Sequence, residues 1–356
     1  MQTSNSARGL DPRQAILGAK VYKPVRDPKT LVEFAVSLGL NWVFVGDELA
    51  TWGRFREQVR KAGLKYALII RMFNDPETAR ADPSLVSTDR QGRPARRADD
   101  VMICPSRADF RRAKLARMKA LIERREPDAV TLDYFRFFIY WEGVDPQTPQ
   151  SGVNFPAFCF DRACLEDFLC STHLSIPLAS GPEPSAAHRD LVDRIWKEHR
   201  EAWYEWRVHR LVENAWEFTG MIRKSFPGLA IVLHAVPWTR EEFGGARQTV
   251  VGQDLRRLAP FFDYVSPMAY SALTRRGPGW VERLSRALLA EFPSAKLLPS
   301  IEVGPDGPQF PAMSAAHYES DLEAVRRAEA GVVLYHLELL LDAPVKQAIT
   351  KRLMQR

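Results

Sequence analysis

Short apolar runs alternate with amphipathic helical patterns along most of the chain. Eight runs are rich in β-branched and aromatic residues and have the length of a buried strand; they are residues 15–24, 41–47, 64–73, 128–137, 228–238, 262–271, 295–304 and 330–340. Nearly every run is followed by a pattern with the three- to four-residue period of a helix. Buried strands that alternate with helices predict a parallel sheet, because the helices provide the crossover connections.

Closure of this sheet as a (β/α)8 TIM barrel is the most economical arrangement, and 356 residues suit that fold with insertions. A doubly wound open sheet is the alternative, but no glycine-rich phosphate loop follows the first strand. We therefore expect a single barrel domain over residues 1–356. Long loops after strands three and four, about residues 74–108 and 138–189, are predicted as insertions on the rim of the barrel.

The helical patterns carry their own start and stop signals. An Asp-Pro pair at Asp27 predicts a helix over residues 27–40, and Gly63 predicts the end of a helix over residues 51–63. Residues 188–226 predict one long helix or two consecutive helices. We expect the tryptophans of this region to pack against the barrel; they are Trp196, Trp203, Trp206 and Trp216.

The segment "AVTLDYFRFF", residues 129–138, places one acid, Asp133, in an otherwise apolar and aromatic run. With two-residue alternation, Thr131, Asp133 and Phe135 share one face of the strand. A carboxylate that points into a barrel mouth is costly unless it is paired or functional. A functional carboxylate is our first interpretation, and a buried ion pair with Arg71 is the alternative.

Other polar and aromatic side chains fall at the predicted strand ends, where a barrel forms its site. The predicted catalytic carboxyl groups are Asp133, Glu302 and Glu338, with Asp133–Glu302 as the first pair and Asp133–Glu338 as the second. The predicted substrate contacts are Asp47, Arg71, Tyr134, Arg136, Trp141, His234, Trp238, Tyr270 and His336. Aromatic rings suit the apolar faces of sugars, and carboxylates suit their hydroxyls. Glycoside hydrolysis needs two carboxyl groups, one protonated and one ionised.

Several segments resemble the glycoside hydrolases of the TIM-barrel, α-amylase-like superfamily, a mostly uncharacterised group. "DAVTLDYFRFF" and "LAPFFDYVSPMAYS" carry the resemblance, and "CFDRACLEDF", "GPGWVERL" and "AGVVLYHLELL" are looser matches. It implies a barrel that acts on glycans, with Asp133 as the catalytic carboxylate. The other residues that match the two signatures are Tyr134, Arg136, Ser266, Met268 and Tyr270. Glu302 stands where such proteins often have Gln, so the second carboxylate stays open.

The four cysteines are Cys104, Cys159, Cys164 and Cys170, too few for a disulfide scaffold. The spacing C-x4-C-x5-C-x2-H, from Cys159 to His173, fits no familiar zinc module. We therefore predict no metal ligand and no cofactor, and expect these cysteines to pack as small apolar groups. A Cys159–Cys164 disulfide is the alternative if the protein is exported.

The composition of the chain limits the classes of partner that it can bind. The chain is 46% hydrophobic and 26% charged, as in ordinary globular proteins, and no run approaches the roughly 18 apolar residues of a membrane span. The formal charge of +6 and the segment "DRQGRPARRADD" favour an anionic or partly deacetylated glycan. No nucleic-acid module is recognisable. Export with a removed signal is slightly favoured over a cytoplasmic location, and the sequence leaves the oligomeric state open.

Two other hypotheses remain beside the glycosidase. A catalytically silent barrel that binds glycan predicts a stacking groove formed by Trp141, Trp238 and Trp280. A metal-dependent barrel enzyme would use nitrogen and oxygen ligands at the strand ends, namely Asp47, His234, His336 and Glu338.

Overall fold

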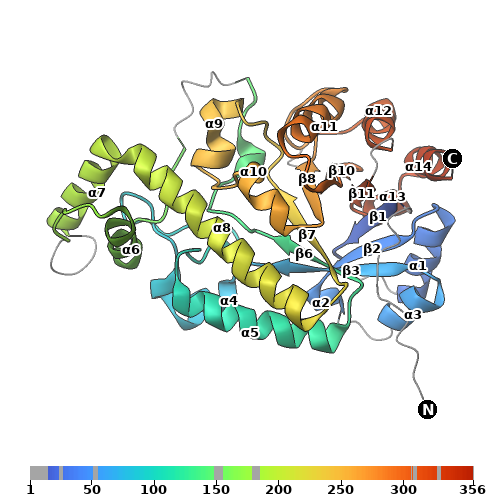
Figure 1. The fold of residues 1–356 in the computed structure, drawn as a ribbon. Helices are drawn as coiled ribbons and strands as arrows, with labels where there is room; N and C mark the ends of the chain where they lie inside the picture. The colour runs from blue at the N-terminus through green and yellow to red at the C-terminus, as the bar shows by residue number, and fades with distance from the viewer. Residues whose placement is uncertain are drawn as a thin grey trace, which may run out of the picture.

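A ring of parallel strands forms the centre of the molecule (Figure 1). The computed structural model describes residues 15–23, 27–50, 55–147, 155–178, 185–305, 307, 311–326 and 330–355. In spatial order the strands are β1 (Ile16–Val21), β2 (Trp42–Gly46), β3 (Lys65–Arg71), β6 (Ala129–Asp133), β7 (Ala230–Ala235), β8 (Tyr264–Ala269), β9 (Lys296–Leu297) with β10 (Ser300–Glu302), and β11 (Gly331–Tyr335). Pairing of β10 with β8 and of β11 with β1 closes the ring. The predicted (β/α)8 barrel is confirmed.

Helices surround the ring and fill the connections. Those that follow the strands are α1 (Pro28–Ser37), α2 (Asp47–Ala50), α3 (Phe55–Lys61), α5 (Ala108–Arg125), α8 (Arg200–Ser225), α9 (Glu242–Thr249), α10 (Leu255–Leu258), α11 (Trp280–Glu291), α12 (Ala315–Val325), α13 (Glu338–Leu341) and α14 (Pro344–Met354). The rim insertions hold α4 (Pro76–Ala81), the β4 (Arg96–Arg97) and β5 (Asp100–Val101) hairpin, α6 (Arg162–Thr172) and α7 (Ala186–Glu198). In Figure 1, α6 and α7 extend away from the ring. No helix of the described residues is long and apolar enough to cross a membrane.

The predicted helix signals act where expected. The Asp27 carboxylate caps α1 by accepting the backbone N–H of Lys29 at 3.0 Å. Residues 188–226 form two helices, α7 and α8, which meet at His199. Trp203 and Trp206 are buried; they contact the rim helix α6 and belong to the apolar cluster that includes the outward faces of the strands. The prediction for Trp216 is wrong, because this side chain is 68% exposed.

The strands are shorter than predicted, and in three of them the point where the strand ends or breaks affects the site. Strand four ends at Asp133, because Tyr134 has a left-handed backbone (φ 50°) and turns the chain out of the sheet. Phe135 consequently leaves the face of Asp133 and packs in the outer core against Phe73. Strand seven is interrupted at Pro299, which has no N–H for the ladder. Strand eight ends at Tyr335, so the predicted site residues after it lie in a turn and in α13.

The side chains inside the barrel change from apolar to polar along the strands. At the amino-terminal side it is filled by an apolar cluster that includes Ile16, Trp42, Phe44, Ala67, Ile69, Ala129, Val232, Tyr264, Leu298 and Val333. Successive inward positions are two residues apart, so the next layer is reached at the carboxyl ends of the same strands. That layer is polar and contains Lys20, Thr131, Asp133, His234, Ser266, Ser300 and Glu302. The site therefore rests on a packed apolar floor.

The pairing of β11 with β1, which we call the seam, closes the ring and can be tested at Gly331. Gly331 has a φ of 102°, and a Cβ there would lie 2.0 Å from the carbonyl oxygen of Ile16. We expect Gly331→Ala to lower the free energy of unfolding by more than about 2 kcal/mol, because both the backbone and the strand pairing would have to shift. Gly220→Ala on α8 is the control, since an added Cβ meets no atom within 4 Å and alanine is the better helix former. Urea unfolding measures both, and equal midpoints for Gly331→Ala and wild type would contradict this account of the seam.

Candidate active site

Asp133 lies at the end of β6, and its side chain is 14% exposed. Nδ1 of His234 on β7 is 3.1 Å from Oδ1 of Asp133, and the same oxygen accepts the backbone N–H of Tyr134 at 2.9 Å. Burial by itself raises the pKa of this carboxyl group, but His234, the charge of Lys20 and the Tyr134 N–H lower it well below its usual range. Asp133 is therefore ionised at neutral pH.

Lys20 supplies a buried cation from the end of β1; only 1% of this residue is exposed. Its Nζ donates to the hydroxyl of Tyr270 at 2.9 Å and lies 5.8 Å from the ring centre of Tyr335. Burial lowers the pKa of Lys20 to about 7, although Asp133 opposes the shift. Burial and then the charge of Lys20 also lower the pKa of His234. At neutral pH the layer combines the Asp133 carboxylate, a neutral His234 and a partly protonated Lys20.

Two further acids lie near Tyr134, one from each rim insertion. The Tyr134 hydroxyl donates to the carboxylate oxygens of Asp100 in β5, at 3.1 and 3.2 Å. Glu142 belongs to the insertion after β6. Burial raises the pKa of Glu142, and the charge of Asp100 adds to this shift while Arg136 opposes it. The rim insertions thus bring the carboxyl group of Glu142, whose pKa is raised, close to Tyr134, the residue that follows Asp133.

Glu302 ends β10 and is 2% exposed. Its two carboxyl oxygens lie 3.0 and 3.2 Å from the backbone N–H of Leu273, which donates to them. Burial raises the pKa of Glu302 to about 7, and Asp321 adds to the shift while the Leu273 N–H opposes it. Around neutral pH the barrel mouth therefore holds one carboxyl group that is ionised, Asp133, and one that retains its proton in part, Glu302.

Glu338 is the first residue of α13 and lies beside His336. Its Oε1 accepts the backbone N–H groups of Tyr22 and Lys23, and its Oε2 is 2.8 Å from Nδ1 of His336. Burial by itself raises the pKa of Glu338, but the contacts with His336 and Lys23 lower it below its ordinary value. Both oxygens are engaged in contacts that join the ends of β1 and β11, so this geometry fits a positioning role.

Two of the predicted charged contacts, Asp47 and Arg136, form hydrogen bonds outside the Asp133 layer, although the Arg136 guanidinium also lies 5.0 Å from the ring centre of Tyr134. Asp47, at the start of α2, is 44% exposed and accepts from Nε of Arg125 at 3.1 Å. Arg136 is buried and donates to two backbone carbonyls of its own loop, including that of Ile139 at 3.0 Å. Both contacts hold helices and loops together.

Arg71 and Asp133 are paired in the register of β3 and β6, as the side-by-side strand ends predicted. The sequence suggested an ion pair between these two side chains. In the structure, Asp133 contacts His234 instead. Arg71 is exposed and forms no ion pair with any residue that the structure describes. It is therefore a cation that faces solvent at the mouth.

The predicted aromatic contacts are buried in the wall of the site. Trp141 lies 6.0 Å, ring centre to ring centre, from Tyr270, and the Tyr270 ring stacks on Tyr335 at 4.4 Å. Trp238 packs against Phe243 at 4.9 Å. The three tryptophans expected to form a stacking groove, Trp141, Trp238 and Trp280, are all buried. In this structure they offer no free ring face to a sugar.

The residues proposed for a metal-dependent reaction are not gathered together. Asp47 contacts Arg125, His234 contacts Asp133, and His336 contacts Glu338. Within the described part of the chain, the group of side chains with metal-ligand spacing lies elsewhere, at three cysteines and one aspartate.

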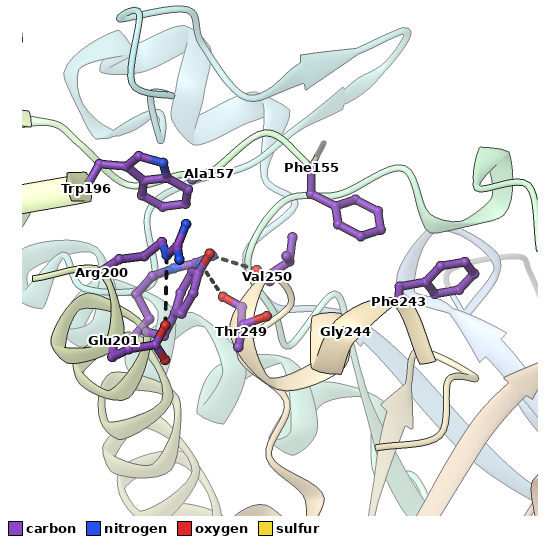
Figure 2. Close-up of a pocket in the computed structure, with 11 residues that line it drawn as sticks. Phe155, Ala157, Trp196, Arg200, Glu201, Phe243, Gly244, Thr249 and Val250 are labelled. Atoms are coloured by element: carbon purple, nitrogen blue, oxygen red, sulfur yellow. Dashed lines mark hydrogen bonds and ion pairs between the residues drawn. The ribbon is translucent and has the colours of Figure 1, made fainter. Parts of the chain in front are cut away.

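A pocket of about 430 Å³ lies on the rim, where α7, α8 and α9 meet the loop at residues 155–157. Trp196 and Arg200 lie on one side of it, and Phe155 and Phe243 on the other (Figure 2). None of the site residues predicted from the sequence lines this pocket. The packing of Trp238 on Phe155 and Phe243, at 5.7 and 4.9 Å, places one aromatic wall between the pocket and the Trp141–Tyr270 cluster.

Sequence reasoning missed Lys20, Asp100 and Glu142. Lys20 carried the same signal as Asp133, a lone charge in an apolar strand, "AILGAKVY". Asp100 and Glu142 lie on the long loops, Asp100 in a polar segment and Glu142 directly after the aromatic run "FFIYW", and the folding of these loops brings them to Tyr134. Charges within strands can be found from alternation, whereas charges on long loops cannot.

The comparisons with known proteins agree on the fold. No protein-family profile and no curated protein sequence matches the chain. The glycoside hydrolase domain of PgaB (BpsB) from Bordetella bronchiseptica is similar over 95% of this chain and 98% of its own length, with a TM-score of 0.66 and 11% identity. A β-galactosidase from the psychrophilic Marinomonas ef1 is similar over 89% of this chain, with a TM-score of 0.62 and 14% identity. The chain spans about half of that enzyme, 53% of its length.

An α-L-fucosidase, isoenzyme 2 from Paenibacillus thiaminolyticus, is similar over 96% of this chain and 49% of its own length. Its TM-score is 0.59 and its identity 11%. At such identities the likeness shows a shared barrel architecture.

The buried Lys20 predicts a specific dependence of stability on pH. Its pKa is about 7 in the folded chain and 10.5 as a free side chain, so between these values the unfolded state binds more protons. The free energy of unfolding of wild type relative to Lys20→Met should therefore rise with pH across this range, by at most about 1.4 kcal/mol per pH unit. Urea unfolding of both proteins at several pH values measures the difference. A difference that is flat with pH would show that Lys20 keeps its ordinary pKa, and one that falls with pH would show that its pKa is raised; either result would contradict the prediction.

Proposed function

We propose that this chain is a glycoside hydrolase that acts on a poly- or oligosaccharide at the carboxyl ends of its barrel strands. Asp133 carries the proposal: it is a largely buried carboxylate, held ionised beside His234, above the apolar floor of the barrel. Such a group can attack the anomeric carbon of a sugar or activate a water molecule for the attack. The barrel's likeness to glycoside hydrolases supports the same direction.

Glu302 is our candidate for the proton donor. Glycosidases pair a carboxylate of low pKa with a carboxyl group of raised pKa, because the second must still hold a proton when the leaving oxygen needs it. The pKa of Glu302, about 7, meets that need, whereas the pKa of Glu338 is lowered. Glu142, whose pKa is also raised, is the competing donor, and it is more exposed to solvent than Glu302.

The charges around the site support an anionic glycan as the substrate. Arg71 faces solvent at the barrel mouth. The arginine-rich segment contributes Arg90 and Arg93 to a second pocket of about 340 Å³, which shares Phe155 and Trp196 with the rim pocket. Cations and aromatic rings along one rim suit a chain of sugars that carries acidic groups.

The role of Asp133 is tested by Asp133→Asn, which keeps the shape of the side chain and removes its charge. We expect reducing-end release from the substrate glycan to fall by at least ~100-fold, since the nucleophile or base would be lost. A panel of neutral, cationic and anionic polysaccharides identifies the substrate first. Glu33→Gln, an exposed acid on α1, is the control and should retain full activity. Full activity in Asp133→Asn would refute the assignment, and glycan retention without cleavage would indicate a binding barrel.

The role of Glu302 is tested by the pH dependence of kcat. Activity should fall as the pH rises through about 7, because the donor then loses its proton. Glu302→Gln should remove this fall of kcat at high pH. The variant should also recover activity on aryl glycosides, whose leaving groups need no proton. The same rescue should fail for Asp133→Asn. Glu142→Gln is the parallel variant, and a loss of this fall there but not in Glu302→Gln would move the donor to Glu142.

A further inference from the structure

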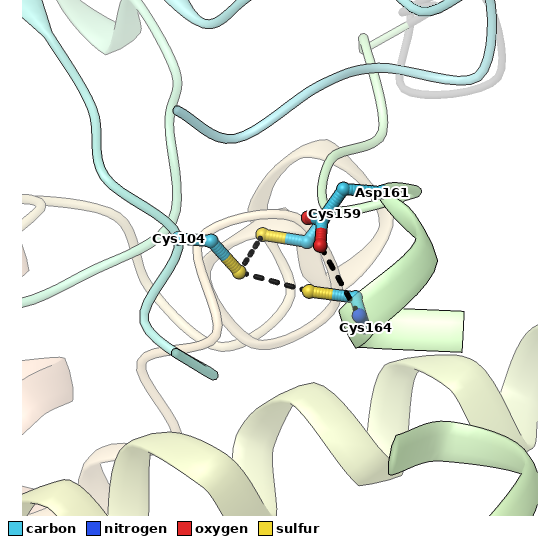
Figure 3. Close-up of side chains that lie close together, drawn as sticks. All are labelled: Cys104, Cys159, Asp161 and Cys164. Atoms are coloured by element: carbon cyan, nitrogen blue, oxygen red, sulfur yellow. Dashed lines mark hydrogen bonds between the residues drawn. The ribbon is translucent and has the colours of Figure 1, made fainter. Parts of the chain in front are cut away.

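Three cysteines from distant parts of the sequence converge in the rim, and the proposed function assigns them no role. The Sγ of Cys104 is 2.9 Å from the Sγ of Cys159 and 2.9 Å from the Sγ of Cys164. All three thiols are buried and free of disulfides, and they point toward one another (Figure 3). The fourth cysteine, Cys170, is exposed further along α6 and lies outside the group.

A carboxyl group completes the cluster. The ligand atoms of Asp161 and the three thiols all lie within 4.8 Å of one another. Asp161 caps α6, with Oδ1 accepting the backbone N–H of Cys164 at 3.2 Å. Its other oxygen, Oδ2, is buried and has no hydrogen-bond partner among the described residues, and the residue as a whole is 7% exposed. A buried carboxylate oxygen without a partner is costly unless a ligand satisfies it.

The surroundings of the cluster suit a negatively charged site. The charges of Asp161 and Cys104 act on the guanidinium of Arg107, and the three thiols act on that of Arg207. The hydroxyl of Ser87 lies 2.8 Å from the Sγ of Cys159, within reach of a hydrogen bond to a thiolate. Three thiolates and a carboxylate around a divalent cation would carry two negative charges, which Arg207 offsets in part; Arg107 is also paired with Asp109, at 3.2 Å.

We propose that Cys104, Cys159, Asp161 and Cys164 form a structural zinc site. Thiolate and carboxylate are established zinc ligands, and four protein ligands close the tetrahedron that a structural site requires. In such a site the sulfur atoms stand about 3.8 Å apart, as follows from Zn–S bonds of about 2.3 Å, so ligand atoms that all lie within 4.8 Å of one another are compatible with one ion. Three thiolates favour Zn²⁺ over the harder Mg²⁺ and Ca²⁺.

The zinc would join the two rim insertions. Cys104 lies just before α5 in the insertion after β3, whereas Cys159, Asp161 and Cys164 belong to the insertion after β6. The pairing of Asp89 with Phe158 already brings these two segments together next to the cluster. Because the same insertions carry Asp100 and Glu142, the metal would hold the rim around the barrel mouth without taking part in the reaction.

Metal analysis of the purified wild-type chain tests the proposal. We expect about one zinc ion per chain, lost in Cys104→Ser and Cys164→Ser and retained in Cys170→Ser, the matched control on α6. The wild-type protein provides a second measurement that needs no variant. After chelation it should take up Co²⁺ and show thiolate-to-cobalt charge transfer with the intense visible bands of a tetrahedral ion.

Each contrary result would overturn the site. Wild-type protein that contains no zinc and gives no thiolate–cobalt absorption has thiols that only pack. Two reactive thiols in denaturant without reductant, instead of four, would indicate a disulfide within the cluster. Zinc lost equally in Cys170→Ser, or retained in both cluster variants, would indicate adventitious binding. None of these results depends on glycosidase activity, so the zinc site and the proposed function can fail separately.

Discussion

Burial of one charge, the carboxylate of Asp133, constrains the upper half of the barrel. A carboxylate in that position is stable only with compensation, and the structure provides it through His234, Lys20 and the N–H of Tyr134. The ammonium group of Lys20 in turn donates a hydrogen bond to the hydroxyl of Tyr270, whose ring stacks on Tyr335. One ionised group therefore accounts for polar and aromatic side chains at the ends of four further strands. The apolar layer beneath them excludes water from one side of this network.

Similar carboxyl groups acquire different roles from their surroundings. Asp133 is ionised because His234, the charge of Lys20 and the Tyr134 N–H together outweigh its burial, whereas the backbone N–H groups that contact Glu302 do not outweigh its burial beside Asp321. Glu338 resembles Asp133 in its lowered pKa, but backbone N–H groups and His336 occupy its oxygens. Acid and base functions at one pH depend on such differences in environment rather than on residue type.

The rim insertions share one apolar cluster with the outer core of the barrel, to which they add contacts of their own. Their core is the aromatic packing of α6 against α8 and the buried cluster of thiols, and the acids near Tyr134 are carried on the same segments. A crosslink in the rim would reduce the freedom of these loops without touching the sheet. This division suits a fold in which the barrel supplies rigidity and the loops supply specificity.

The sequence alone determined the barrel, since the alternation of apolar runs and helical patterns is a local property. It also placed Asp133 and Glu302 near the ends of their strands, because the approximate extent of an apolar run is a local property too. It did not determine where strand four stops, which depends on the left-handed backbone of Tyr134. Tertiary structure also decided which partner Asp133 has, which carboxyl groups keep a proton, and that Cys104 joins Cys159 and Cys164 across 55 and 60 residues. These properties arise from burial and from contacts between segments far apart in the chain, and no local pattern encodes either.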